Sequence, residues 1–469
     1  MDFANNGRID LFQSPNDYRR SSAIRSAIIQ KREILNRIKR EIAQLGIELA
    51  LHNSYPVPTE ILSHIFILLA QDYGPVYFPI PEWMDPPPQI AISQVCSHWR
   101  RVALRTSELW NNTHLTRPKA RHLNQTAYIH HLRRWLTRAG TLPVRLSINF
   151  NNLPGNVEIA TLLHTILLPF HVKRLHLSLT YKNLAELSTL PETMVSDLID
   201  LSINLTLSRD MLDVNMNDNP HHLVTRLRSL TFYGDEFTDV WLGKLSLAFP
   251  WYQLQSLNFG YIPVPDLHPL IEILHQTPKL RVLSLMILKF HIDALQELTL
   301  PSLRELRLGV DKDVDEGTDL VAVLHSFTCP SLIRLKLCVH APPTAWAVEG
   351  FEIIRQQYNM QGLEEIEFDC FPLSISLLLQ NAPMLRMLTV RRDAILDDAA
   401  IIGISSGTLG RFLTYLDLGH IACDINEVIG MVETRMKTSC DGDERESGLG
   451  GAIAKLEEAG INITIQPYQ

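Results

Sequence analysis

The sequence predicts an α/β protein in which an N-terminal helical part is followed by a long array of short strands and return helices. Two patterns support this fold class. Apolar residues between positions 24 and 104 recur at helical spacing, and from residue 143 onward an apolar-x-x-apolar-x-apolar unit returns at regular intervals. The chain of 469 residues, 46% of them hydrophobic, is long enough for several domains and a sizeable core.

The first 53 residues divide into two parts. Residues 1–22 are expected to be disordered, and residues 23–53 predict an amphipathic helix with a heptad seam. The positions of this seam lie alternately four and three apart: Ile24, Ile28, Lys31, Leu35, Ile38, Ile42, Leu45 and Leu49. So short a seam is marginal as a free coiled coil, so it either folds back on the chain or supports self-association through residues 24–49.

Residues 54–115 predict two helices with broad apolar faces. Pro58 suits the first turn of a helix, and Glu60 in that turn complements the helix dipole. The apolar residues of the two helices are Ile61, Leu62, Ile65, Phe66 and Leu69, then Val95, Cys96, Trp99, Val102 and Ala103, with Leu109-Trp110 after them. Two short helices cannot bury so much apolar surface alone, so we expect a partner to cover it.

Three segments of this region resemble the F-box, the adaptor-docking module of SCF-type ubiquitin ligases. They are residues 57–66 (VPTEILSHIF), 93–104 (SQVCSHWRRVAL) and Leu109-Trp110. The resemblance implies an all-α F-box that docks on a Skp-family adaptor and, through it, on a cullin-RING ligase. By the same resemblance, the adaptor-binding residues are Pro58, Ile61, Leu62, Ile65, Val95, Cys96 and Trp99.

The layout of the chain resembles that of the expanded fungal F-box families. It departs from the compact F-box pattern at Val57, where Leu is usual, and in a Pro-rich insertion at residues 71–90. A connecting helix is expected at residues 116–141. Basic residues between 100 and 138 form either a patch for an acidic partner or a solvated helical face.

Residues 142–469 predict a degenerate leucine-rich-repeat solenoid. The repeated unit begins at residues 143, 172, 198, 227, 254, 280, 303, 332, 363, 385 and 413. The mean spacing of 27 residues falls within the leucine-rich-repeat range of about 20–29. Pro143 stands where Leu is expected, and residues 439–451 predict a flexible acidic loop. A doubly wound α/β sheet is the competing fold, because it too alternates strands and helices.

A solenoid of this kind exposes alternate strand residues on its concave face, where we expect a target protein to bind. The candidate target-binding residues are Tyr233, Asn258, Arg307, Lys336, Glu365, Glu367, Asp369 and Tyr415. Neighbouring parallel strands lie about 4.8 Å apart, so Lys336 and Glu367 could instead neutralise each other. Pairing and docking remain alternatives for these charges.

The composition argues against several other classes of function. A net charge of −8 gives no general attraction to nucleic acid or anionic membranes, and the six scattered cysteines, expected to be buried and reduced, lack metal-ligand spacing. No leader or membrane-spanning run is expected, so the cytoplasm or nucleus is predicted. The Gly403–Gly407 segment matches the G-x-S-x-G pattern of hydrolases, but within a repeat rather than at an expected nucleophile elbow.

We therefore expect a protein that is not an enzyme and needs no cofactor or metal. The favoured function is that of the substrate-recognition subunit of an SCF-type ubiquitin ligase, with the repeats binding an unknown target protein. The alternative is a leucine-rich-repeat scaffold without ligase association.

Overall fold

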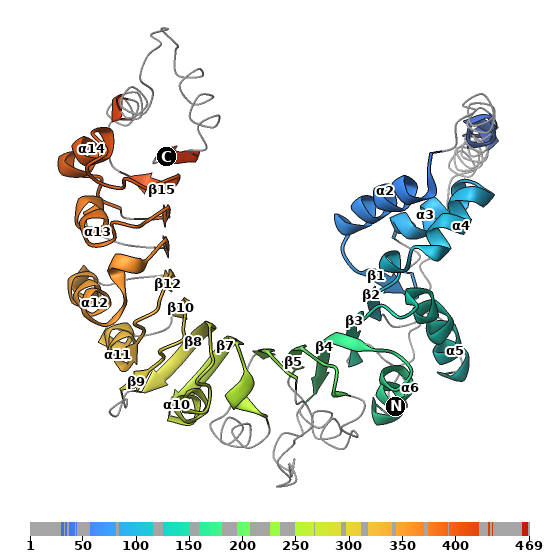
Figure 1. Ribbon diagram of the computed structural model, residues 1–469, viewed down its shortest axis with the longest axis horizontal. Helices are drawn as coiled ribbons and strands as arrows, with labels where there is room; N and C mark the ends of the chain where they lie inside the picture. The colour runs from blue at the N-terminus through green and yellow to red at the C-terminus, as the bar shows by residue number, and fades with distance from the viewer. Residues whose placement is uncertain are drawn as a thin grey trace, which may run out of the picture. The chain divides into compact units, whose positions relative to one another are not determined.

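A computed structural model describes most of the chain between residues 30 and 467 (Figure 1). The described residues are 30–31, 33–34, 37–42, 44, 57–80, 84–115, 125–150, 159–180, 195–206, 226–234, 249–266, 268–291, 297–310, 318–339, 344–369, 374–392, 394–421, 430–431, 434 and 462–467. Two compact units are present, Met1–Ile65 and Phe66–Gln469, and their boundary falls inside one helix. The expected disorder at residues 1–22 and the expected loop at 439–451 lie outside the described residues.

The described residues between 30 and 44 are helical, as the heptad pattern predicts. Ile38 and Ile42 of the predicted seam are exposed, and so is Ile34. The seam residues Ile24, Ile28, Leu35, Leu45 and Leu49 lie outside the described residues. Folding back and self-association therefore both stay predictions.

The segment after residue 57 contains three helices where two were predicted. They are α2 (Thr59–Gln71), α3 (Pro88–Val95) and α4 (Ser97–Arg105), with the short 3₁₀ turn η1 (Ser107–Leu109) after them. The expected second helix is broken at Cys96, whose extended backbone ends α3. Cys96 also caps α4, because its Sγ accepts the N–H of Trp99 at 3.4 Å.

Among the described residues, fourteen parallel strands form one sheet in chain order. They are β1 (Val76–Phe78), β2 (Asn112–Leu115), β3 (Val144–Asn149), β4 (Val172–Thr180), β5 (Asp200–Thr206), β6 (Ser229–Gly234), β7 (Ser256–Asp266), β8 (Val282–His291), β10 (Glu305–Val310), β12 (Arg334–Val339), β13 (Glu365–Phe368), β14 (Met387–Val390), β15 (Tyr415–Ile421) and β16 (Asn462–Pro467). A separate pair joins β9 (Leu298–Thr299) to β11 (Phe327–Thr328).

Each of the eleven predicted repeat units contains a strand of this sheet, from β3 to β15, beginning within two residues of its predicted first position. The order of the strands follows the chain, whereas a doubly wound sheet reverses direction at a switch point. A sequential parallel sheet is compatible with a solenoid.

The sheet begins earlier than the predicted boundary at residue 142. Strand β1 lies in the expected Pro-rich insertion, where Val76-Tyr77-Phe78 offers a β-branched residue and two aromatics, and β2 lies in the expected all-α segment. Strand β1 pairs with β2, β2 pairs with β3, and β3 pairs with β4. The sheet therefore begins inside the segment predicted to be all-α, at residues 54–115.

Alternation along the strands produces the core. In β5, for example, Leu201, Ile203 and Leu205 are buried and the residues between them are half-buried. The helices lie along one side of the strands (Figure 1). They are α5 (Gln125–Leu136), α6 (Ile159–Leu167), α10 (His268–His275), α11 (Thr318–Ser326), α12 (Thr344–Gln357), α13 (Ile375–Asn381) and α14 (Asp398–Ser405), with the 3₁₀ turns η2 (Thr137–Ala139), η5 (Trp251–Gln253) and η6 (Met360–Gly362). The other face of the sheet carries mostly polar side chains.

Candidate functional site

Helix α2 presents a stripe of exposed apolar side chains. Its members are spaced four, three and one apart, which places them on one side of an α-helix: Ile61, Ile65, Leu68 and Leu69. Pro58 is also exposed, and its carbonyl accepts the N–H of Leu62 at 2.9 Å, which starts the helix. The Leu62 side chain is only 4% exposed, so it offers a partner almost no surface.

Helices α3 and α4 contribute a second group of exposed apolar atoms. Val95 at the end of α3 is 59% exposed, and Cys96 beside it is exposed as well. Trp99 is half-buried, because its ring lies 5.1 Å from the ring of Phe66. Trp99 therefore has a structural role in addition to any contact with a partner.

The predicted adaptor-binding residues thus fall into two kinds. Four of them present exposed apolar side chains, namely Pro58, Ile61, Ile65 and Val95. Leu62 and Trp99 serve mainly the packing of the helices, and Cys96 serves as a helix cap. Leu68 and Leu104, which sequence reasoning missed, are exposed too. So many large apolar residues exposed on two neighbouring stretches of sequence are typical of an interaction surface.

The second candidate site is the polar face of the sheet. One register row crosses twelve adjacent strands with a polar residue on every strand. In order it reads His114, Ser147, His176, Ser202, Thr231, Asn258, Ser284, Arg307, Lys336, Glu367, Thr389 and Asp417. The first seven are neutral side chains that are able to form hydrogen bonds, and the charged residues follow from β10 onward.

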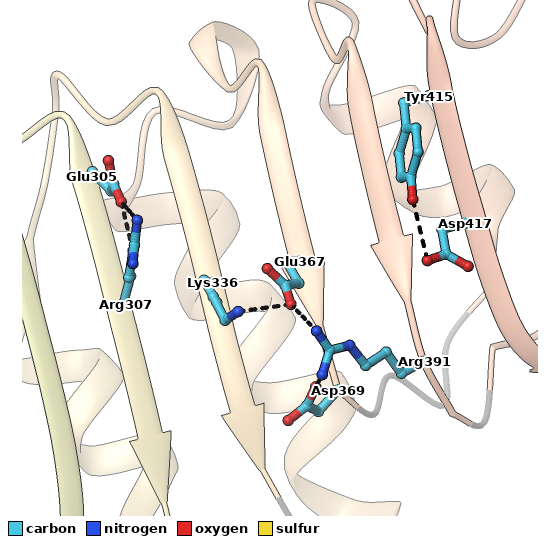
Figure 2. A network of polar contacts seen from close by, with 8 residues as sticks. All are labelled: Glu305, Arg307, Lys336, Glu367, Asp369, Arg391, Tyr415 and Asp417. Atoms are coloured by element: carbon cyan, nitrogen blue, oxygen red, sulfur yellow. Dashed lines mark hydrogen bonds and ion pairs between the residues drawn. The ribbon is translucent and has the colours of Figure 1, made fainter. Parts of the chain in front are cut away.

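The charged part of this face is internally paired (Figure 2). Lys336 Nζ lies 2.8 Å from Glu367 Oε1, and Arg391 Nη2 lies 2.7 Å from the same oxygen. The predicted neutralisation of Lys336 by Glu367 is confirmed. Arg391 Nη1 also lies 3.4 Å from Asp369 Oδ1, although this oxygen has no hydrogen bond among the described residues.

Glu305 is the buried centre of a second group of charges. This side chain is only 8% exposed and contacts two guanidinium groups, those of Arg307 and Arg334. Glu305 Oε2 accepts from Arg334 Nε at 2.9 Å, and Arg334 Nε also lies 3.9 Å from Glu365 Oε2. We call the two groups together the charged cluster: Glu305, Arg307, Arg334, Lys336, Glu365, Glu367, Asp369 and Arg391.

The charged cluster has equal numbers of acids and bases, and their contacts are mutual. Five of the predicted target-binding residues belong to it, namely Arg307, Lys336, Glu365, Glu367 and Asp369. A charged partner would have to break these pairs before it could use them. Burial, and then the neighbouring Asp369 carboxylate, raise the pKa of Cys338 to about 11, so this thiol stays protonated beside the cluster.

The remaining predicted residues are two tyrosines and an amide. The exposed Tyr233 accepts a hydrogen bond from Asn258 Nδ2 to its Oη at 3.4 Å. Its ring lies over Gly260, where an added Cβ would come within 2.5 Å of Tyr233 Cδ1. Tyr415 Oη donates to Asp417 Oδ2 at 3.4 Å (Figure 2). Tyr233 is thus a positioned aromatic on the neutral part of the face.

Two histidines that sequence reasoning missed lie in the same neutral part. His176 Nδ1 is 2.7 Å from Ser202 Oγ, and the ring of His114 is 4.9 Å from that of Tyr77. Burial lowers the pKa of both histidines, so both are neutral near pH 7. The first seven residues of this register row therefore carry no charge near pH 7.

The hydrolase pattern at residues 403–407 does not form a nucleophile elbow. Ser405 is the last residue of helix α14, and its Oγ donates to the Ile401 carbonyl at 2.6 Å. An elbow would require a strand before the serine, and Ala399–Ile402 is helical instead. Within the described residues no cluster of three or more His, Cys, Asp or Glu side chains could hold a metal ion. The described helices also include none long and apolar enough to cross a membrane.

The comparison with protein families identifies an F-box-like domain at residues 57–116. This range contains α2, β1, α3, α4 and β2 and agrees with the resemblance seen in the sequence. It supports an F-box protein, and F-box domains in general bind Skp-type adaptors and serve as adaptors in ubiquitin ligases. A search among curated proteins found no match to the chain.

Proposed function

We propose that this chain is the substrate-recognition subunit of an SCF-type ubiquitin ligase. The observation that carries the proposal is the F-box-like domain at residues 57–116 together with its exposed apolar side chains. An apolar surface of this kind gains free energy when a partner removes it from water, at about 25 cal/mol per Å². A Skp-family adaptor is the partner that the domain implies.

In this proposal the chain itself catalyses nothing. The adaptor connects the F-box-like domain to a cullin-RING ligase, and the ligase supplies the conjugating enzyme. Bringing a target next to that enzyme raises the effective concentration of the target's lysines, which is a positioning effect. The compartment would be the cytoplasm or the nucleus.

The sheet would be the target-binding half, organised as a degenerate leucine-rich-repeat solenoid. Three features support this part of the proposal: sequential strand order, the Leu-rich repeat pattern, and helices along one side of the strands. The polar face would then be the concave face on which such repeats bind proteins.

Co-expression with a Skp-family adaptor tests the proposal. We expect the full-length chain to co-purify with the adaptor, and Ile61→Asp or Val95→Asp to abolish the complex, because each places a charge on an exposed apolar side chain. Ile402→Asp is the matched control, since Ile402 is an exposed isoleucine on helix α14, outside the F-box-like domain. Trp99→Ala is a poor probe because it also removes the contact with Phe66.

The result that would overturn the proposal is a folded chain that does not bind the adaptor at all. Equal loss of binding in Ile402→Asp would also count against it, because the effect would then not be specific to the F-box-like domain. In either case a repeat scaffold without ligase association becomes the better description.

A further inference from the structure

A row of basic side chains crosses one edge of the sheet at the start of its strands. Lys173 lies in β4, and Arg228, Arg281 and Arg304 directly precede β6, β8 and β10. All four side chains are exposed. We call this set the basic rim: Lys173, Arg228, Arg281 and Arg304.

Backbone hydrogen bonds place these residues in one register row, in which Ile199 and Gln255 separate the first three members. Ile199 N–H donates to the Lys173 carbonyl, and Arg228 N–H donates to the Ile199 carbonyl. The ladder continues through Gln255 to the last two members, because Arg281 N–H donates to the Gln255 carbonyl and Arg304 N–H donates to the Arg281 carbonyl. At about 4.8 Å per strand, the basic rim extends over about 24 Å.

The basic rim differs from the charged cluster in having no acids of its own. None of its four side chains has an ion-pair or hydrogen-bond partner among the residues that the structure describes. Nearby acids at this edge are already engaged: Asp197 pairs with Arg226 and His171, and Asp200 lies 3.9 Å from Arg174. The four cations of the rim are therefore unpaired among the described residues.

We propose that the basic rim binds an acidic, extended segment of the target protein. An extended segment of about seven residues covers about 24 Å at about 3.3 Å per residue, which matches the length of the rim. Guanidinium groups bind carboxylates with two parallel hydrogen bonds, which suits three arginines out of four cations.

A peptide fits these observations better than nucleic acid. The rim is a single line of four cations on a chain with a net charge of −8. It therefore lacks the broad basic surface that attracts nucleic acid. The rim residues also include no aromatic side chain on which a base could stack. Single-stranded RNA therefore serves as a competitor in the test.

The test is fluorescence anisotropy with the full-length chain and a labelled peptide of about 12 alternating Glu and Ser residues. We expect binding that weakens as salt rises from about 50 to about 500 mM, and little binding of a peptide with Gln in place of Glu. Arg281→Gln/Arg304→Gln should weaken binding about threefold to thirtyfold. Arg355→Gln/Arg386→Gln is the control with the same change in net charge, because both of those arginines already have glutamate partners.

Several outcomes would overturn the inference. They are equal loss in both double variants, equal binding of the Gln peptide, no binding of the Glu peptide, or stronger binding of a single-stranded RNA of similar length. The inference rests on the proposed role of the sheet as the target-binding half, but the assay contains no adaptor. Failure of the peptide assay with intact adaptor binding would therefore reject the rim and leave the ligase association standing.

Discussion

Glu305→Ala should destabilise the chain more than any other acid-to-alanine change in the charged cluster. The Glu305 side chain is 8% exposed and lies between Arg307 and Arg334, which are 56% and 45% exposed. Removing one partner of a fully buried pair costs about 3–5 kcal/mol. Because water reaches both arginines, we reduce the expected loss in the free energy of unfolding to about 1–3 kcal/mol.

Glu365→Ala is the matched comparison. Its side chain is 45% exposed and lies 3.9 Å from Arg334, so its loss should cost about 0–1 kcal/mol. Urea unfolding, followed by circular dichroism, would measure the free energy of unfolding of both variants. The loss in Glu305→Gln should lie between the losses in Glu305→Ala and Glu365→Ala, because an amide oxygen still accepts a hydrogen bond. Equal urea midpoints for Glu305→Ala and Glu365→Ala would refute the argument that burial decides the cost.

Three further predictions concern single side chains. Iodoacetamide at neutral pH should modify the exposed Cys96 but not Cys329, since burial raises the pKa of Cys329 to about 12. Mass spectrometry would measure the labelling of each cysteine, and equal labelling of the two would contradict this prediction. Gly260→Ala should displace the Tyr233 ring and cost about 1–3 kcal/mol, and an unchanged urea midpoint would contradict the close contact. Ser405 should not react with a fluorophosphonate probe, because its hydroxyl is bonded within helix α14; labelling that disappears in Ser405→Ala would contradict this.

The repeat strands could be predicted because one leucine pattern encodes both burial and spacing. Leu283, Leu306 and Leu335 are buried, lie in register on neighbouring strands, and were recognisable from the sequence alone. The same register made the contact between Lys336 and Glu367 predictable. Once the strand starts are known, residues at equal positions in successive repeats become neighbours.

Features that depend on one backbone dihedral or on a distant partner could not be predicted. A helical apolar pattern continues through Cys96, so periodicity gave no sign of the break between α3 and α4. Leu62 fits the apolar stripe of α2 as well as Ile61 does, and only the structure shows that one is buried and the other exposed. The basic rim was missed because the sequence reasoning considered alternate strand residues and passed over the position after each first leucine.

Strand β1 changes the role of the Pro-rich segment between α2 and α3. This segment was predicted to be an insertion, but Val76–Phe78 pairs with β2, and β2 pairs with β3 of the repeat region. Aromatic contacts add to this connection, since the Phe78 and Trp135 rings lie 5.5 Å apart and those of Trp110 and Trp135 lie 4.9 Å apart.

Helix α4 is tied to the same group of residues. Trp110 Nε1 donates to the Ala103 carbonyl of α4 at 2.9 Å, and Trp135 Nε1 donates to Thr113 Oγ1 of β2 at 3.3 Å. Helix α4 and strand β2 are therefore connected through hydrogen bonds from Trp110 and Trp135, whose rings also contact each other.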